Sequence, residues 1–313
     1  MTERSTAHPA PTPAVPAPTT VIIGNFDGVH LGHQQLLRAA ADLGRPVTVV
    51  TFWPHPRSVL TPDNAPLLLT GLDDRVELVK RYSNATVRIT PFTREFANWE
   101  PARFIESVLL PLNPATVVVG ENFTFGRGAQ GTPATLAADG RFEVLVIPLV
   151  EIQAARASSS RIRDLLGEGD VETAATLLGR DWRVRGVVMV GDQRGRTLGF
   201  PTANIAIPED MVEPADGVYA GWVRLLDDGP DSPPLAAAIS VGSNPTFAAQ
   251  QRRIEAHVIG RDDLELYGAN IAVDFVAHLR GMVRFACVDD LKSQLAQDVT
   301  HATTLLAEAV GRE

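Results

Sequence analysis

One stretch decides the fold of the N-terminal half of this chain: Val21–His33, which reads Val-Ile-Ile-Gly-Asn-Phe-Asp-Gly-Val-His-Leu-Gly-His. An apolar, β-branched run leads into a glycine-containing loop, and residues 34–43 after it have a helical pattern. A strand, a glycine loop and a helix N-terminus in succession bind phosphate, because free backbone N–H groups and the helix dipole attract an anion. The loop is neither a Walker A motif nor a Gly-x-Gly-x-x-Gly dinucleotide motif.

Two histidines, His30 and His33, stand at the end of this loop, where a Walker motif would carry its lysine. Imidazole rings there can donate hydrogen bonds to charge that develops on an α-phosphate. The element resembles the His-x-Gly-His signature of the nucleotidylyltransferase superfamily, whose histidines stabilise attack on the α-phosphate of a nucleotide. Two alternatives remain open from the residues: a metal pair, with Asp27 as the local third ligand, or ordinary surface residues at a helix start.

The composition limits the class of protein. The 313 residues are enough for about two domains. The net charge of −9 argues against a general nucleic-acid binder, so anionic substrates would need local basic pockets. The single cysteine, Cys287, cannot form an intrachain disulfide, and we expect it to be a small buried hydrophobe beside Phe285.

The first 20 residues are rich in proline, alanine and threonine and lack the apolar core of a secretory signal. We therefore expect them to form a disordered tail. No apolar run reaches the roughly 18–20 residues that span a bilayer. These features predict a soluble, cytoplasmic protein with no membrane partner.

The first half alternates strand and helix patterns. Near-continuous apolar runs predict strands at 21–23, 47–52, 86–89, 116–119 and 142–147. Helical patterns lie at 34–43, 73–81, 101–109, 160–166 and 171–178. Such alternation favours a Rossmann-like α/β domain with a parallel sheet, whose ligands bind beyond the carboxyl ends of the strands. Three polar loops follow strands there: the histidine loop, residues 53–57 and residues 120–123.

The pattern changes near Asp181. Six short alternating segments without intervening helices predict an antiparallel barrel or sandwich, at 184–190, 202–207, 218–226, 236–241, 253–259 and 271–279. An amphipathic helix at 288–310 would close the chain. The expected parts are a tail over 1–20, an α/β domain over 21–180 and an all-β domain over 181–313.

Two further stretches of the first half fit a nucleotide or flavin site. The loop Asn122–Arg127 offers an amide and aromatic rings for stacking. Taken alone, the loop favours the alternative of two core phenylalanines, because phenylalanine is so often buried. The stretch Ser158–Arg163 joins a helix N-terminus to two arginines, which suits a polyphosphate. An N-cap followed by exposed arginines is the alternative.

The barrel half contains a second set of candidates. Thr202 and Asn204 are two apart and share one strand face, so their oxygens suit a Mg²⁺ ion that bridges ATP phosphates. Glu255 lies on the polar face of its strand, where it is a candidate general base. In both cases an ordinary polar strand face is the alternative.

Taken together and in this order, these pieces resemble the prokaryotic bifunctional riboflavin kinase/FMN adenylyltransferase (FAD synthetase) family from about residue 21 to the C-terminus. The stretches that carry the resemblance are Gly24–His33, Phe52–Pro56, Gly120–Gly126, Ser158–Arg163, Gly195–Asn204, Asp216–Tyr219, Gly242–Phe247 and Leu266–Gly268. The resemblance implies an N-terminal FMN adenylyltransferase domain and a C-terminal six-stranded riboflavin kinase barrel. Riboflavin, FMN and ATP would be the small-molecule substrates, and Mg²⁺ the cofactor.

The resemblance also implies roles for individual residues. Catalysis would involve His30, His33 and Glu255. Metal binding would involve Thr202 and Asn204. Nucleotide binding would involve a larger set: Gly24, Asn25, Phe26, Asp27, Ser160, Arg161, Arg163, Gly191, Gly195, Arg196, Thr197 and Pro201. Flavin binding would involve His55, Pro56, Asn122, Phe125 and Arg280.

Two positions depart from the family pattern. Ser160 stands where the family usually has threonine, which keeps a hydroxyl group, and Ala269 stands where it usually has lysine. Two other hypotheses compete with a bifunctional enzyme. Only one half could be active, or the barrel could be a flavin-binding carrier, which would not need a pair of Mg²⁺ ligands. The sequence leaves the oligomeric state open.

Overall fold

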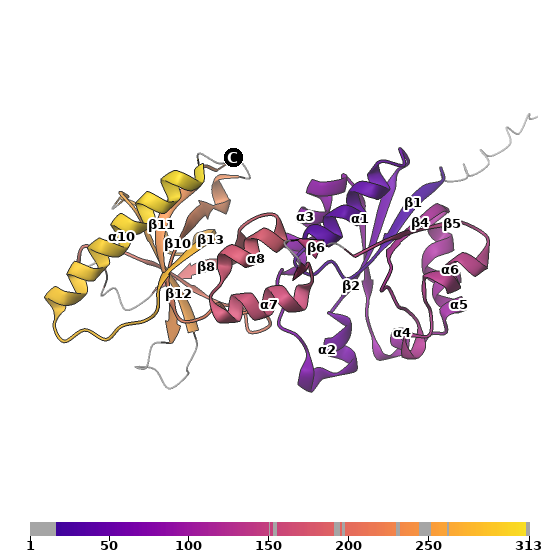
Figure 1. Ribbon diagram of the computed structural model, residues 1–313, viewed down its shortest axis with the longest axis horizontal. Coiled ribbons are helices and arrows are strands. Elements are labelled where there is room, and N and C mark those ends of the chain that lie inside the picture. The colour runs from indigo at the N-terminus through magenta and orange to yellow at the C-terminus, as the bar shows by residue number, and fades with distance from the viewer. Residues whose placement is uncertain are drawn as a thin grey trace, which may run out of the picture. The chain divides into compact units, whose positions relative to one another are not determined.

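The structure is a computed structural model, and it describes residues 17–149, 151–152, 155–190, 195, 198–229, 232–243, 252–261 and 263–310 (Figure 1). Contacts between residues divide it into two compact units. The first consists of the described residues up to Gly24, Leu36–Pro56 and Lys80–Pro148. The second consists of Asn25–Gln35, Arg57–Val79 and the described residues from 149 onward. The division of the chain at residue 180 stays a prediction.

The first unit contains a five-stranded parallel sheet, as the sequence predicts. Its strands are β1 (Thr19–Ile23), β2 (Val47–Trp53), β3 (Thr86–Pro91), β4 (Pro114–Gly120) and β5 (Glu143–Ile147). Their order is β3-β2-β1-β4-β5, so the strand order reverses between β1 and β4. In open α/β sheets this reversal is the point where ligands bind, beyond the carboxyl ends of the strands. Residues after β1, β2 and β4 therefore begin at adjacent positions along one sheet edge.

Helices and short turns alternate with these strands. The helices are α1 (Leu31–Ala41), α2 (Pro56–Leu60), α3 (Leu72–Ser83), α4 (Arg94–Ala97), α5 (Pro101–Phe104) and α6 (Pro133–Asp139). Shorter turns are η1 (Pro62–Asn64), η2 (Ile105–Leu109), η3 (Leu110–Leu112) and η4 (Arg127–Ala129). One core cluster joins apolar strand residues such as Val21 and Val117 to Phe104 and Phe125. Burial of these side chains supplies the main driving force for folding of this unit.

The second unit contains a closed antiparallel barrel with the strand order β10-β11-β12-β9-β8-β13. Its strands are β8 (Trp182–Met189), β9 (Ala203–Ala206), β10 (Gly217–Leu225), β11 (Leu235–Ser243), β12 (Arg252–Val258) and β13 (Asn270–Arg280), with the turn η5 (Leu226–Asp228). In β12, Ile254, Ala256 and Val258 are buried and alternate with half-buried polar residues. The alternation follows because successive strand residues face opposite sides of a sheet. The closed strand order confirms the predicted six-stranded barrel.

Further helices and a small hairpin are described in the second unit from residue 149 onward. They are β6 (Glu151–Ile152), β7 (Ala155–Arg156), α7 (Ser159–Glu168), α8 (Val171–Leu178) and α10 (Val288–Val310). The predicted closing helix α10 contacts β10, β11 and β13 (Figure 1). Its Ala302 and Leu306 pack against Ala220 and Ala277 of the barrel, so small side chains let the helix approach the strands closely. Within the described residues, no helix has the length and apolarity needed to cross a membrane.

The expectation for Cys287 is wrong. The side chain is exposed, and its sulfur accepts a hydrogen bond from the Asp290 backbone N–H at 3.4 Å. The residue immediately precedes α10, where the first N–H groups of the helix have no intrahelical acceptor. Its position at a helix start, rather than its apolar character, therefore determines its surroundings.

Candidate functional site

The histidine loop has an unusual backbone in the second unit. Phe26, Gly28 and Val29 have φ values of 54°, 80° and 40°, in the left-handed region that a β-branched residue such as Val29 rarely adopts. The carbonyl of Val29 accepts a hydrogen bond from the Gln34 side chain at 3.0 Å, and the Gln34 amide also donates to Leu178 at 2.8 Å. The surrounding contacts thus hold a conformation that costs energy, as is common at functional sites.

The two histidine rings lie against each other at the start of α1. Their centroids are 3.8 Å apart and their planes differ by 19°. The His33 backbone N–H donates to His30 Nδ1 at 3.4 Å. A Cβ at Gly32 would lie 3.1 Å from the His30 ring, closer than an ordinary van der Waals contact, so a side chain there would require the ring to shift. Because Nδ1 of His30 accepts, the ring proton of the neutral form lies on Nε2, where it is able to donate.

Burial keeps both rings neutral. It lowers the pKa of His30 from 6.5 to about 4; Asp27 opposes this shift, while Arg180 and Arg163 add to it. Burial also lowers the pKa of His33 well below 6.5, and the neighbouring His30 and Arg75 act in the same direction. The rings are therefore hydrogen-bond groups rather than cations at neutral pH. The described residues contain no cluster of three His, Cys, Asp or Glu side chains suited to a metal ion, so the metal-pair interpretation gains no support.

The pKa shift predicts the titration of His30. Because burial disfavours the charged ring, lowering the pH from 8 to 5 is expected to leave the His30 ring neutral, with protonation only near pH 4. An NMR titration of the ring Cε1–H resonance, assigned with a His30→Asn variant, would measure this. The reference for comparison is the ordinary histidine pKa of about 6.5. A His30 midpoint near about 6.5 would contradict the predicted burial effect.

Charged residues surround the same loop. The buried Asp27 carboxylate forms ion pairs with Arg75 and Arg163, and Arg180 donates to the Gly28 carbonyl at 2.7 Å. The guanidinium groups of Arg75, Arg163 and Arg180 thus all act on the two neutral imidazoles. Sequence reasoning missed Arg75 and Arg180, because nothing in their local sequence connects them to the loop 48 and 152 positions away.

The serines at the N-terminus of α7 contact the same histidine loop. Ser158 is the N-cap of α7 and accepts from the Arg161 N–H at 3.3 Å, so the cap interpretation is confirmed. Ser159 donates to the Asp27 carbonyl at 2.8 Å, and Arg163 in the next turn pairs with the Asp27 side chain. The structure thus brings Asp27, His30, His33 and Arg163 together. Ser160 and Arg161 are exposed on the first turn of the helix.

Asn25 belongs to the second unit, whereas Gly24 and the predicted flavin-binding residues of the α/β half lie in the first unit. Gly24 follows β1, His55 and Pro56 follow β2, and Asn122 is exposed after β4. Phe125 is 7% exposed, belongs to the core cluster and stacks on Phe123 with centroids 5.6 Å apart. Its burial favours the alternative of core phenylalanines, and its contact with flavin stays a prediction.

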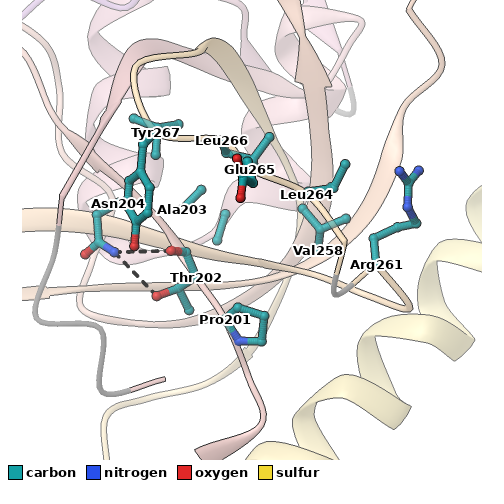
Figure 2. A pocket seen from close by; sticks show the side chains of 12 residues that line it. Pro201, Thr202, Ala203, Asn204, Val258, Arg261, Leu264, Glu265, Leu266 and Tyr267 are labelled. Atoms are coloured by element: carbon teal, nitrogen blue, oxygen red, sulfur yellow. Dashed lines mark hydrogen bonds between the residues drawn. The ribbon is translucent and has the colours of Figure 1, made fainter. Parts of the chain in front are cut away.

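The barrel contains the second candidate site, a cavity of about 170 Å³. Figure 2 shows the side chains of Thr202, Asn204 and Tyr267 gathered beside this cavity. Its lining comprises Val188, Pro201, Thr202, Ala203, Asn204, Ala256, Val258, Arg261, Leu264, Glu265, Leu266 and Tyr267. Asn204 Nδ2 donates to Thr202 Oγ1 at 3.4 Å, which brings the predicted metal-binding side chains together.

Glu255 lies in β12 directly opposite Asn204 of β9. Residues opposite each other on antiparallel strands share a face, with Cβ atoms about 4.5–5.5 Å apart. Among the described residues, Glu255 lies outside the lining of the cavity but next to this lining residue. His257, on the same face, shares a 2.9 Å hydrogen bond with the Pro201 carbonyl and so fixes the start of the Thr202–Asn204 segment.

The other predicted residues of the barrel half are more scattered. Arg280 forms an ion pair with Asp298 of α10 at 2.6 Å. Gly195 accepts a backbone hydrogen bond from Phe200 at 2.8 Å, and Pro201 lines the cavity. Gly191, Arg196 and Thr197 lie outside the described residues.

The fold and these two sites define a class of protein: a nucleotidyltransferase-like α/β fold joined in one chain to a six-stranded barrel. Two family models match the chain, FAD synthetase over residues 12–161 and riboflavin kinase over residues 178–306. Relatives named bifunctional riboflavin kinase/FMN adenylyltransferase include the Bacillus subtilis (strain 168) protein, which is 33% identical over 91% of this chain and 92% of its own length. The Escherichia coli (strain K12) relative of that name is 35% identical over 88% and 89%.

A solved structure agrees in fold. A crystal structure described as a macrolide-efflux protein from Streptococcus pneumoniae superposes with a TM-score of 0.82 and 32% sequence identity, over 91% of this chain and 93% of that chain. The chain belongs to the bifunctional riboflavin kinase/FMN adenylyltransferase family.

Proposed function

We propose that this chain converts riboflavin to FMN in its barrel and FMN to FAD in its α/β half, with ATP as the donor in both reactions. The observation that carries the proposal is that the two family models cover separate halves, and each half presents a site of its own. One site has neutral paired histidines beside arginines. The other has Thr202 and Asn204 at a cavity with Glu255 alongside.

In the adenylyltransferase reaction, a phosphate oxygen of FMN attacks the α-phosphorus of ATP, and the bond to the β-phosphate oxygen breaks to release pyrophosphate. His30 and His33 donate hydrogen bonds to charge that grows on the α-phosphate. Arg163, with Ser160 and Arg161 of α7, binds the triphosphate. Asn122 and His55 contact the flavin in this proposal. Asp27 and His30 are buried, and low solvent exposure strengthens electrostatic interactions at this loop.

In the kinase reaction, the riboflavin 5′-hydroxyl attacks the γ-phosphorus of ATP, and ADP leaves. Glu255 accepts the hydroxyl proton, and Thr202 and Asn204 hold the phosphates in line with it. A Mg²⁺ ion bound there would neutralise phosphate charge. The donor set fits, since both side chains carry neutral oxygens within one strand segment, although the Asn204 amide must rotate to present Oδ1 beside Thr202 Oγ1.

A product time course tests the proposal directly. The full chain is incubated with riboflavin, ATP and Mg²⁺, and riboflavin, FMN and FAD are separated by liquid chromatography. If FMN rises first and FAD follows, the result would support kinase activity in the barrel and adenylyltransferase activity in the α/β half, with FMN as the intermediate. FMN without FAD would leave an inactive α/β half, and FAD from supplied FMN without FMN formation would leave an inactive barrel. No turnover by the folded protein would favour the flavin-carrier alternative.

Replacing Thr202 by valine is expected to raise the Mg²⁺ concentration that gives half-maximal riboflavin phosphorylation by about tenfold, since valine keeps the shape but removes one oxygen ligand. The measurement is the initial rate of FMN formation across a Mg²⁺ series at saturating ATP. FAD formation from supplied FMN is the control and is expected to keep its Mg²⁺ dependence. An unchanged Mg²⁺ series for FMN formation would remove Thr202 from the metal site.

A further inference from the structure

Arg75 is a charged residue that no part of the proposed mechanism uses, yet its side chain is fully buried on α3. One terminal nitrogen donates to the Asn25 carbonyl at 3.1 Å. The other reaches the Asp27 carboxylate and the Thr70 carbonyl, each at 3.3 Å. A buried guanidinium is costly unless it is paired and hydrogen-bonded, and these contacts all lie on the histidine loop or the segment beside it.

Asp27 is the centre of this arrangement. Its carboxylate accepts hydrogen bonds from the Leu69 N–H at 3.0 Å and the Thr70 N–H at 3.1 Å, and it pairs with both Arg75 and Arg163. One negative charge thus lies between two positive charges. Arg163 has a side chain 14% exposed, whereas Arg75 is completely enclosed.

The segment Leu67–Thr70, called the platform below, provides backbone groups for these contacts. On one side its backbone bonds to Asp27, Arg75 and Arg163. On the other side the Leu68 N–H donates to Asp210 at 2.6 Å and the Leu68 carbonyl accepts from Val212 at 2.9 Å. The Leu69 carbonyl accepts from the Trp182 indole at 3.1 Å. Because the platform is held on both sides, its position fixes where Asp27 and Arg163 lie.

We propose that Arg75 is a positioning residue for adenylyl transfer. It neutralises Asp27 from the buried side, so that Arg163 keeps guanidinium donors available for the triphosphate of ATP. Without Arg75, the full charge of Asp27 would act on Arg163 alone and hold it away from the nucleotide. Arg75 also fixes the Asn25 carbonyl, which leads into the turn that carries His30. This proposal rests on the proposed function of the α/β half.

The test compares Arg75→Lys, Arg75→Met and the double variant Asp27→Asn/Arg75→Met in the full chain. KM for ATP and kcat are measured for FAD formation from supplied FMN, and riboflavin phosphorylation is measured on the same preparations. We expect Arg75→Met to raise KM for ATP by about tenfold, the effect of losing about one charge-assisted hydrogen bond, with a smaller change in kcat. Lysine keeps the positive charge but lacks the planar guanidinium group with its several N–H donors. We therefore expect Arg75→Lys to raise KM for ATP by a smaller factor.

The double variant removes both charges and frees Arg163, so we expect its KM for ATP to return toward the parent value. Arg185→Met is the matched control, because Arg185 pairs with Asp74 and Glu77 on the same helix and makes no contact with Asp27. We expect it to leave KM for ATP unchanged. If Arg75→Met does not fold, the lysine and double variants carry the test.

Two results would overturn the proposal. In one, KM for ATP in both Arg75→Met and Arg75→Lys stays within a factor of two of the parent value. In the other, kcat of both reactions falls equally while both KM values hold, which is the signature of a purely structural role. A parent chain that forms no FAD at all would instead overturn the proposed adenylyltransferase function, and this inference with it.

Discussion

Substituting alanine for His30 is expected to lower the rate of FAD formation from supplied FMN by roughly 100- to 1,000-fold, the usual cost of removing one donor to transition-state charge. The ring is neutral, and its Nδ1 is engaged by the His33 N–H, so its contribution is a hydrogen bond from Nε2 rather than a full charge. Alanine also removes the ring that stacks on His33 at 3.8 Å. The measurement is kcat/KM for FAD formation.

Riboflavin phosphorylation by the same His30→Ala preparation is expected to stay within a factor of two, because the proposed kinase residues lie in the barrel and His30 lies in the loop before α1. His30→Asn, which keeps an N–H donor on a shorter side chain, is expected to retain more activity than alanine. His301→Ala, on the exposed face of α10, is the matched control and is expected to change neither rate. Equal loss of both activities in His30→Ala would contradict the separation of the two sites.

The second large effect is expected for Glu255→Gln, which keeps the shape of the side chain but cannot accept the proton of the riboflavin 5′-hydroxyl. Loss of a general base lowers rates by roughly 100- to 10,000-fold, and we expect kcat for FMN formation to fall within this range. The position of Glu255, opposite Asn204 in the barrel, places it near the phosphates in the proposed kinase site. The measurement is the initial rate of FMN formation at saturating ATP and Mg²⁺.

Glu255→Gln is expected to leave the rate of FAD formation from supplied FMN unchanged. His30→Ala, in contrast, is expected to lower that rate and to spare riboflavin phosphorylation. Glu308→Gln on the exposed face of α10 is the control for loss of a carboxylate elsewhere. A Glu255→Gln enzyme with unaltered FMN formation would mean that another group accepts the proton. Substitutions at His30 and Glu255 that each abolished both reactions would indicate one interdependent site.

Much of the fold could be predicted because its signals are local. Apolar runs and helical spacing placed all five parallel strands and all six barrel strands, with ends that differ from the observed ones by one or two residues. Side-chain interactions within three or four residues of the chain were also predictable, such as the capping of the α7 N-terminus by Ser158. Cys287 was not, because composition indicates how often a residue type is buried but not where the next helix begins.

The sequence by itself determined that the histidines stand at a strand–loop–helix junction and that Thr202 and Asn204 share a strand segment. Only the tertiary structure decided their surroundings. Asp27 meets Arg75 and Arg163 across 48 and 136 positions of the chain, and no local pattern encodes such a pairing. The neutral state of His30 is likewise a property of the folded chain, because the burial that lowers its pKa exists only once distant segments have packed around the ring.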